Sequence, residues 1–282
     1  MLKKIIVLGL LCLLVAGPAR AEEIKEFVVF MKIDAEARLH VAEKISYDFG
    51  AETRYGIYRY LPIKYQDGFY KYNLRLEEIE VPEYKFVTSR VGDKLLIKIG
   101  EEGKALAGLQ FYGINYSVSK AFAYSPDRDE LSWQVTGNGW PVGIKLARAE
   151  IDLPRALPAE QVIASCTVGP VEKTVACANW SLVKNDAGLV MGIAFTQKNL
   201  QATEGLAIKL SLPKGVLDRP GVWDWIRENY LVLLFVAVLG GVGLKWRKFL
   251  ILPSFLRRQE SREWSLNDKI PAYAGMTEWY IQ

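Results

Sequence analysis

The side chains that could carry chemistry in this sequence are few. His40 is the single histidine, so a Ser-His-Asp triad would have to use it, and zinc sites built from several histidines are excluded. His40 lies inside an alternating apolar pattern, which favours a structural or exposed role. The sequence contains no glycine-rich phosphate-binding motif and no nucleophile-elbow motif. It therefore identifies no catalytic residue, no metal site and no cofactor.

Acidic residues leave an enzymatic alternative open. Asp127, Asp129 and Glu130 form a short run, but the run lacks the glycine and the ligand spacing of an EF-hand calcium loop. We interpret the run as a solvated turn. Carboxylates that are distant in sequence can still meet in a β protein and act as an acid–base pair. A hydrolase of the cell envelope that uses such carboxylates is therefore the alternative to a binding or structural module.

Two cysteines are expected to remain in the mature chain. Cys12 lies in an apolar N-terminal segment that we expect to be removed, which leaves Cys166 and Cys177. An even number of cysteines in an exported chain predicts a disulfide, and a pair of buried free thiols is the alternative. The spacing is not C-x-x-C, which disfavours a redox-active pair.

An aromatic and basic window is the strongest candidate for a binding surface. Residues 54–75 interleave six tyrosines and Phe69 with arginines and lysines, a combination that can stack on sugars or grip a peptide. The competing interpretation is that these aromatic side chains belong to strands and pack on the core. The candidate binding residues are Tyr55, Tyr58, Arg59, Tyr60, Tyr70 and Trp140.

Trp140 belongs to a second unusual stretch, TGNGWPV at residues 136–142. Gly137 and Gly139 tolerate a positive φ and favour a tight turn, which Trp133 and Trp140 flank. An exposed recognition loop is one interpretation. A hairpin corner held by tryptophan packing is the one that we favour.

Two apolar segments predict the location of the protein. Lys3 and Lys4, the apolar stretch 5–16 and the small residues before position 22 form a secretory signal, so the mature chain should begin at Glu22. The stretch 225–244, followed by a basic flank up to Leu252, predicts one membrane span, with a buried hairpin in a soluble protein as the alternative. The expected location is the inner membrane of a bacterium, with the N-terminal domain outside and the C-terminus in the cytoplasm.

The charge of the chain supports the same location. The formal net charge is +4, but the excess basic residues flank the two apolar segments, and residues 22–228 are slightly acidic. This distribution is typical of membrane targeting and gives no basic groove for phosphates. We therefore expect the lipid bilayer as a partner through one span, and no nucleic acid.

The elements that must position these residues are strands. Short runs with a period of two, such as Val29, Met31 and Ile33, alternate with turn signals along residues 22–217. The pattern predicts a mainly β, sandwich-like extracytoplasmic domain, with a split into two β modules near 143–150 left open. A juxtamembrane linker (218–224), the span with its basic flank (225–252) and a cytoplasmic tail (253–282) complete the expected organisation.

Four stretches carry a resemblance to a known family. They are VAEKISYDF (41–49), GIYRYLPI (56–63), LSWQVTGNGWPVGI (131–144) and LPKGV (212–216). The chain resembles the bacterial predicted membrane proteins of domain of unknown function 2207. The resemblance implies an extracytoplasmic β-rich domain fixed to the membrane, and it supplies no activity or catalytic residue. The expected anchor, the aromatic window and the lack of catalytic motifs favour a binding or structural module of the cell envelope, with an envelope protein or a glycan as its partner. Family members usually continue with further membrane segments, a pattern from which this sequence departs after about Leu252.

The tail itself resembles translated repeat DNA. Codons can be chosen for Pro253–Ser261 whose reverse complement, read one frame over, encodes Ile270–Thr277 in order and matches the end of a codon for Lys269 and the first base of a codon for Glu278. We infer that an inverted DNA repeat interrupted the gene and replaced the native C-terminal region. A basic amphipathic segment that contacts anionic lipid is the alternative.

Overall fold

The computed structural model describes residues 21–68, 70–177 and 179–218, together with residues 226, 230–232 and 234. Residues 1–20 of the expected signal, most of the expected membrane span and the tail lie outside these residues. Among the described residues, there is no helix both long enough and apolar enough to cross a membrane. The chain divides into two compact units, Met1–Arg219 and Pro220–Gln282. All strands belong to the first unit, so the prediction of a mainly β fold is confirmed.

The described residues of the first unit form seventeen strands and one short 3-10 helix, η1. In chain order they are β1 (Glu23–Ile33), β2 (Leu39–Asp48), β3 (Gly56–Pro62), β4 (Lys64–Asp67), β5 (Tyr70–Asn73), β6 (Arg75–Glu80), β7 (Phe86–Val91), β8 (Lys94–Gly100), β9 (Leu109–Ser119), β10 (Phe122–Tyr124), β11 (Arg128–Gln134), β12 (Ile144–Leu157), η1 (Ala159–Gln161), β13 (Ile163–Gly169), β14 (Val175–Ala176), β15 (Trp180–Lys184), β16 (Val190–Leu200) and β17 (Gly205–Pro213).

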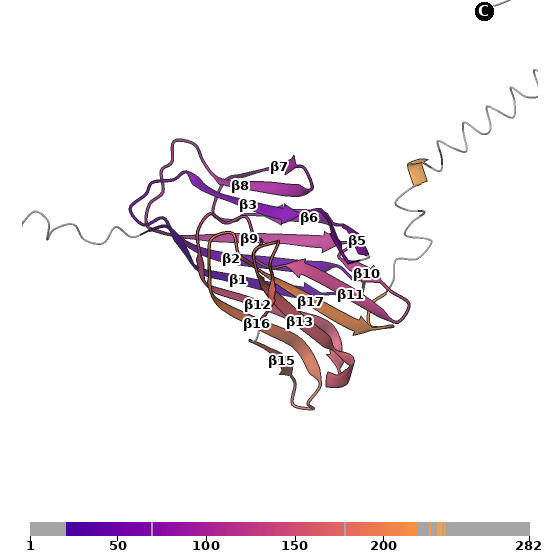
Figure 1. Ribbon diagram of the computed structural model, residues 1–282. Helices are drawn as coiled ribbons and strands as arrows, with labels where there is room; N and C mark the ends of the chain where they lie inside the picture. The colour runs from indigo at the N-terminus through magenta and orange to yellow at the C-terminus, as the bar shows by residue number, and fades with distance from the viewer. Residues whose placement is uncertain are drawn as a thin grey trace, which may run out of the picture. The chain divides into compact units, whose positions relative to one another are not determined.

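The strands form four sheets. The largest has seven strands in the order β15-β16-β12-β1-β2-β9-β6, and the next has five in the order β10-β11-β17-β13-β14. A three-stranded sheet, β3-β8-β7, and the hairpin β4-β5 complete the unit (Figure 1). Within the seven-stranded sheet, β12 runs parallel to β1 on one side, with Ile144 paired with Ile24, and antiparallel to β16 on the other side.

 This parallel pairing places the first strand of the unit at the centre of its largest sheet. Residues 144–150 of the stretch suggested for a split into two modules (143–150) belong to β12, which is hydrogen-bonded to β1 and β16.

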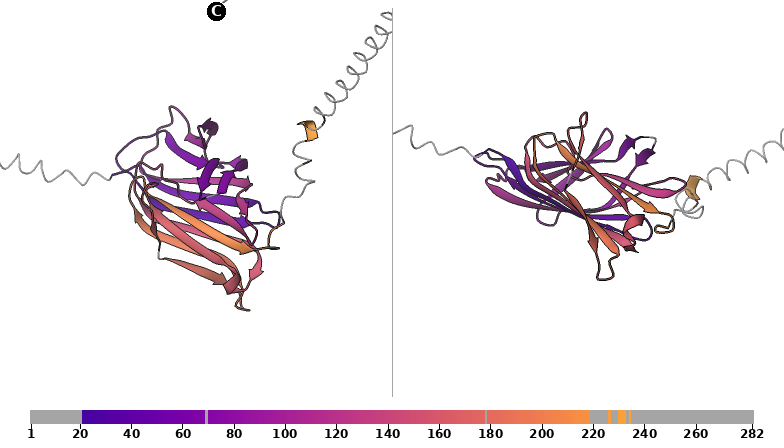
Figure 2. Two further views of the ribbon diagram at one scale, coloured as in Figure 1. Left: turned by 45° about the vertical axis from the view of Figure 1, so that its right-hand side comes forward. Right: turned by 60° about the horizontal axis from the view of Figure 1, so that its bottom comes forward.

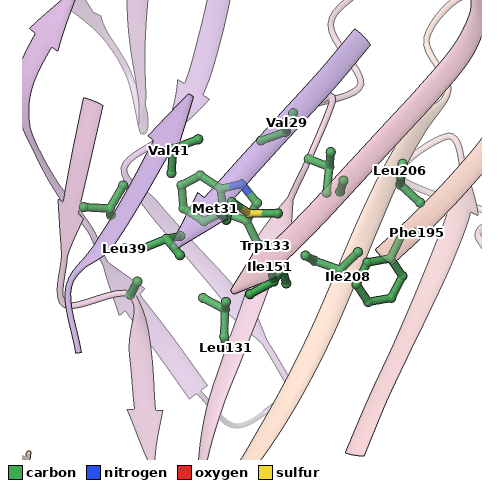
Figure 3. Close-up of a cluster of buried hydrophobic side chains, with 14 of the residues drawn as sticks. Val29, Met31, Leu39, Val41, Leu131, Trp133, Ile151, Phe195, Leu206 and Ile208 are labelled. Atoms are coloured by element: carbon green, nitrogen blue, oxygen red, sulfur yellow. The ribbon is translucent and has the colours of Figure 1, made fainter. Parts of the chain in front are cut away.

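Alternation along the strands builds the core between the sheets. In β1 the side chains of Phe27, Val29, Met31 and Ile33 are buried, whereas Phe30 between them is exposed. Because successive side chains of a strand point to opposite faces, one face of the seven-stranded sheet is apolar and the other is open. Figure 3 shows Val29 and Met31 of this apolar face beside Trp133, Leu206 and Ile208 of the five-stranded sheet, so the two sheets share one core.

The three-stranded sheet covers a further part of the same core. Ile57 and Leu61 of β3 and Ile97 and Ile99 of β8 are buried in the same cluster as the residues of the larger sheets. Figures 1 and 2 show these short strands lying beside β9 and β6, away from the β15 edge of the molecule. The outer side of this sheet is exposed, and β7 forms its free edge.

Two sequence interpretations need correction. The acidic run is no solvated turn, because Arg128, Asp129 and Glu130 begin strand β11, and Asp129 is fully buried with Lys214 as its ion-pair partner. The TGNGWPV stretch is no hairpin corner either. It leads from β11 in the five-stranded sheet to β12 in the seven-stranded sheet, so it is a crossover between two layers.

Candidate functional site

A buried ion pair lies where the sheets meet. Arg59 of β3 donates from Nε to Glu43 Oε2 and from Nη2 to Glu43 Oε1, both at 2.8 Å. Both residues are only 1 % exposed. Tyr116 of β9 donates its hydroxyl to Glu43 Oε1 at 2.6 Å, so three strands contribute to one network. A carboxylate that accepts this many charge-assisted bonds is held in a single orientation.

The other side of the Arg59 guanidinium is bound to the crossover. Nη1 donates to the carbonyl oxygen of Thr136 at 2.6 Å, and Nη2 donates to that of Val135 at 2.9 Å. The indole Nε1 of Trp140 donates to the same Thr136 oxygen at 2.8 Å. At Gly137, a Cβ atom would lie 2.9 Å from Arg59 Nη1, so glycine at this position leaves the room that the guanidinium occupies. The network therefore joins β2, β3, β9 and the crossover.

The electrostatics of this network favour one protonation state. Burial lowers the pKa of Arg59, but the adjacent Glu43 carboxylate outweighs this effect and raises the pKa above its usual value. Burial and the same carboxylate raise the pKa of Tyr116 well above that of a free phenol. Arg59 thus stays charged and Tyr116 stays protonated, as a structural ion pair requires.

The buried arginine determines which side chains of β3 face outward. Because Arg59 points inward with Ile57 and Leu61, Tyr58 and Tyr60 lie on the opposite face of the strand. Tyr58 is 53 % exposed and Tyr60 is half-buried. The network therefore fixes the strand that presents the exposed tyrosine.

Tyr58 borders a groove of about 500 Å³, which we call the tyrosine groove. Its lining residues are Thr53, Arg54, Tyr55, Gly56, Ile57, Tyr58, Lys98, Ile99, Glu101 and Glu102. Tyr55 is 57 % exposed, so two phenol rings are accessible beside the groove. Lys98 lies directly opposite Tyr58 in the β3–β8 register. An exposed aromatic pair among charged and hydroxyl side chains is typical of a binding surface.

A close contact between two backbones holds the groove together. Gly56 and Gly100 face each other where β3 begins and β8 ends, with φ values of +141° and +126°. A Cβ atom on Gly56 would lie 1.8 Å from the Ile99 carbonyl oxygen, and one on Gly100 would lie 1.9 Å from that of Tyr55. Only glycine fits these two positions, and their close backbone contact fixes the position of the neighbouring Tyr55.

Charged side chains border the groove just before β3 and just after β8. Arg54 Nε contacts Glu22 Oε1 at 2.8 Å, which ties the groove to the start of the domain. Glu101 accepts from Lys104 at 2.8 Å and from Lys85 at 2.9 Å, and these two hydrogen bonds lower the pKa of the Glu101 carboxyl. Glu101 therefore presents a negative charge at neutral pH.

The structure separates the six candidate binding residues. Tyr55 and Tyr58 lie together at the tyrosine groove, whereas Arg59 and Trp140 are buried at 1 % and 4 % exposure and cannot meet a partner at the surface. Their burial follows from the hydrogen bonds to Glu43 and to the crossover. The backbone of Tyr70 lies in the hairpin β4-β5, and its side chain falls outside the description.

Cys166 and Cys177 form the expected disulfide, with their Cα atoms 5.3 Å apart. The bond links β13 to the segment that follows β14, close to the point where the chain passes on to β15 of the other sheet. His40 is exposed and contacts Asp34 Oδ2 at 3.0 Å. In the part of the chain that the structure describes, no group of three or more His, Cys, Asp or Glu side chains is placed to hold a metal ion.

Sequence reasoning missed Glu43, although a signal for it exists. Glu43 occupies the inward position of β2 between Val41 and Ile45, and Arg59 occupies the inward position of β3 between Ile57 and Leu61. Opposite charges at the apolar positions of two alternating patterns indicate a buried pair, since an unpaired charge is too costly to bury.

Three of the four resembling stretches, VAEKISYDF, GIYRYLPI and LSWQVTGNGWPVGI, supply Glu43, Arg59 and the crossover, and they meet in this one network. Residues 23–212 match the family described as "Predicted membrane protein (DUF2207) N-terminal domain". The chain belongs to this family. No curated protein matches the DUF2207 chain.

Solved structures give only a distant likeness. An M1 zinc metallopeptidase from Deinococcus radiodurans is 9 % identical with a TM-score of 0.36, over 67 % of this chain and 42 % of that chain. A putative protease from Parabacteroides distasonis is 11 % identical with a TM-score of 0.37, over 67 % of this chain and 41 % of that chain. The DUF2207 chain thus spans less than half the length of these proteins, and a likeness at this level carries no argument about its activity.

Proposed function

We propose that this DUF2207 protein is a membrane-anchored binding module of the bacterial cell envelope, and that its tyrosine groove contacts a glycan. The observation that carries the proposal is the exposure of Tyr55 and Tyr58, at 57 % and 53 %, on a rigid backbone beside the groove. A phenol ring offers an apolar face on which a sugar ring can stack. Lys98 and Glu102 beside it supply the polar partners that sugar hydroxyls need.

The anchoring of this module rests on the family and on the sequence. The family is one of predicted membrane proteins, and the apolar stretch 225–244 follows the β domain after the short linker 218–224. A reporter that is active only outside the cytoplasm tests the topology. It should be active when fused after residue 217 and silent when fused after residue 252. The opposite result contradicts the proposed orientation.

Binding of envelope polysaccharides tests the groove. The full-length protein in detergent micelles is incubated with insoluble peptidoglycan and with other purified envelope polysaccharides, and the bound fraction is measured. Replacing a central aromatic contact by alanine costs about 2 kcal/mol, so Tyr55→Ala or Tyr58→Ala should weaken binding about 30-fold. Trp180→Ala is the matched control, because Trp180 is an exposed aromatic on the distant strand β15.

Two results would overturn the proposal. Equal binding by wild type and both tyrosine variants would remove the groove as the contact surface. Release of soluble fragments from a polysaccharide, abolished by replacing one carboxylate, would favour the envelope hydrolase instead.

A further inference from the structure

The outer face of the seven-stranded sheet carries a second surface, which we call the acidic face. Two hollows of about 550 and 450 Å³ lie on it, and Phe30 lines both. None of the lining residues of these hollows belongs to the tyrosine groove. Phe30 is 42 % exposed and Phe111 is 58 % exposed, which is unusual for phenylalanine on a strand whose other face already forms the core.

Small residues between large ones create the hollows. Across the sheet, Phe30 of β1 lies opposite Ala42 of β2, and Ala42 lies opposite Asn115 of β9. Two residues further along β2, Lys44 lies opposite Gly113, whose missing side chain leaves open space. The small residues therefore leave space beside Phe30, which side chains of a partner can enter.

Carboxylates surround these hollows. Glu150 of β12 and Glu80 of β6 lie on opposite sides of Phe30 in the same row, since Phe30 pairs with Glu150 and Asn115 pairs with Glu80. Asp152 lies beside Lys32 in the next row. Among the residues that the structure describes, Glu80, Glu150 and Asp152 make no ion pair, so their charges are available.

A bulge directs a further carboxylate to the same face. The pairing of β6 with β9 shifts between Glu77 and Glu80, and Glu78 between them has a φ of 55°. Ser117 Oγ donates to Glu78 Oε2 at 2.9 Å, which holds the Glu78 side chain over the sheet. Bulges commonly redirect a side chain in this way.

The charges of the lining residues determine the class of partner. Six carboxylates (Glu26, Glu78, Glu80, Glu83, Glu150 and Asp152) line the hollows, against two lysines, Lys32 and Lys44, and one histidine, His40. This imbalance repels nucleic acid and anionic lipid and attracts a basic partner. Lys44 Nζ already lies 5.5 Å from the centre of the Phe30 ring, so the geometry for a cation on this aromatic face is present.

We propose that the acidic face binds an extended, lysine- or arginine-rich segment of a partner protein. The aliphatic stems of the basic side chains cover Phe30 and Phe111, and their charged ends reach the surrounding carboxylates. This surface is independent of the tyrosine groove, so the two proposals can fail separately.

A peptide titration tests the acidic face. The full-length protein in detergent micelles is titrated into a labelled synthetic peptide that alternates lysine with leucine, and a peptide that alternates glutamate with leucine is the charge control. Wild type should bind the basic peptide and lose affinity as salt is added. The double variant Glu80→Lys/Glu150→Lys should bind at least about tenfold more weakly.

Three further variants distinguish binding at the acidic face from general electrostatic attraction. Glu160→Lys/Glu172→Lys changes the net charge equally at exposed positions outside the acidic face and should bind like wild type. Gly113→Leu fills the open space without changing any charge and should weaken binding. Tyr55→Ala should leave binding of the basic peptide unchanged, whatever its effect on glycans.

Three outcomes would overturn the inference. Equal losses in the two double-lysine variants would show attraction by net charge alone. Binding of the acidic peptide with similar affinity would remove the charge argument. Self-association of wild type in analytical ultracentrifugation, lost in Gly113→Leu, would show that a second copy of the chain occupies the face.

Discussion

The buried pair of Glu43 and Arg59 gives the sharpest prediction about stability. Glu43→Gln removes the negative charge but keeps the size of the side chain, and it leaves the Arg59 guanidinium buried without a counter-ion. Removing one partner of a buried ion pair costs about 3–5 kcal/mol. In a domain of this size each kcal/mol lowers the melting temperature by about 2–4 °C, so we expect a fall of roughly 6–20 °C.

The double variant tests the physical reason for this cost. Arg59→Met alone leaves the Glu43 carboxylate buried with Tyr116 as its remaining donor, and it should also destabilise strongly. Glu43→Gln/Arg59→Met leaves no buried charge, so its loss of free energy should be at least about 2 kcal/mol smaller than the sum of the two single losses. Some loss will persist, because the carbonyl groups of Val135 and Thr136 no longer receive the arginine donors.

Thermal unfolding of residues 22–218, followed by circular dichroism, provides the assay, because these residues form a compact unit with its own core. Glu101→Gln is the matched control, since it removes a charge from exposed ion pairs with Lys85 and Lys104 and should leave the melting temperature unchanged. The reasoning is refuted if Glu43→Gln shifts the melting temperature by less than about 2 °C, or if the two single losses simply add.

Three further predictions concern the glycine contact, the phenols and the disulfide. Gly100→Ala should cost at least about 2 kcal/mol in urea unfolding, because its Cβ atom meets a carbonyl oxygen, whereas Gly92→Ala, which also has a positive φ but open space, should cost about 1 kcal/mol. Burial and the Glu22 carboxylate raise the pKa of Tyr47 to about 12. The folded state therefore holds a proton that the unfolded state loses near pH 10, so stability should fall as the pH rises from about 10 towards 12. In absorbance measurements at alkaline pH, the Tyr47 phenol should titrate later than a free phenol. Titration of this phenol at its ordinary pKa in the folded protein would contradict the prediction. Cys177→Ser should lower stability by about 2–4 kcal/mol, and dithiothreitol should have the same effect on wild type and none on the variant; quantitative alkylation of Cys166 and Cys177 in wild type without reductant would refute the bond.

Much of the fold could be predicted because alternation is a local property of the sequence. Val29, Met31 and Ile33 indicate the buried face of β1 without any knowledge of its neighbours. Strand order is not local. The parallel pairing of β1 with β12 and the passage of the crossover from one sheet to another depend on contacts between distant segments, which alternation does not encode.

The candidate site could be predicted only in part for the same reason. Tyrosine suits both a core and a binding surface, so the sequence window could not separate the exposed Tyr55 and Tyr58 from the buried Arg59 beside them. The position of Arg59 within its alternating pattern indicates a buried side chain, but only when it is considered together with the inward position of Glu43. A pair of inward charges on two strands is therefore the pattern to look for in similar sequences.

The last strand of the domain has a mechanical consequence. β17 lies in the middle of the five-stranded sheet, bound along its length by β11 on one side and β13 on the other. Beyond it, Asp218 N donates to the Ala35 carbonyl oxygen at 2.7 Å, and Arg155 Nη2 donates to that of Gly215 at 3.0 Å. A pulling force that enters the domain from the chain after Asp218 must first break these bonds. A force directed along β17 then loads its two ladders in shear, where many hydrogen bonds share the force at once, instead of opening them one at a time.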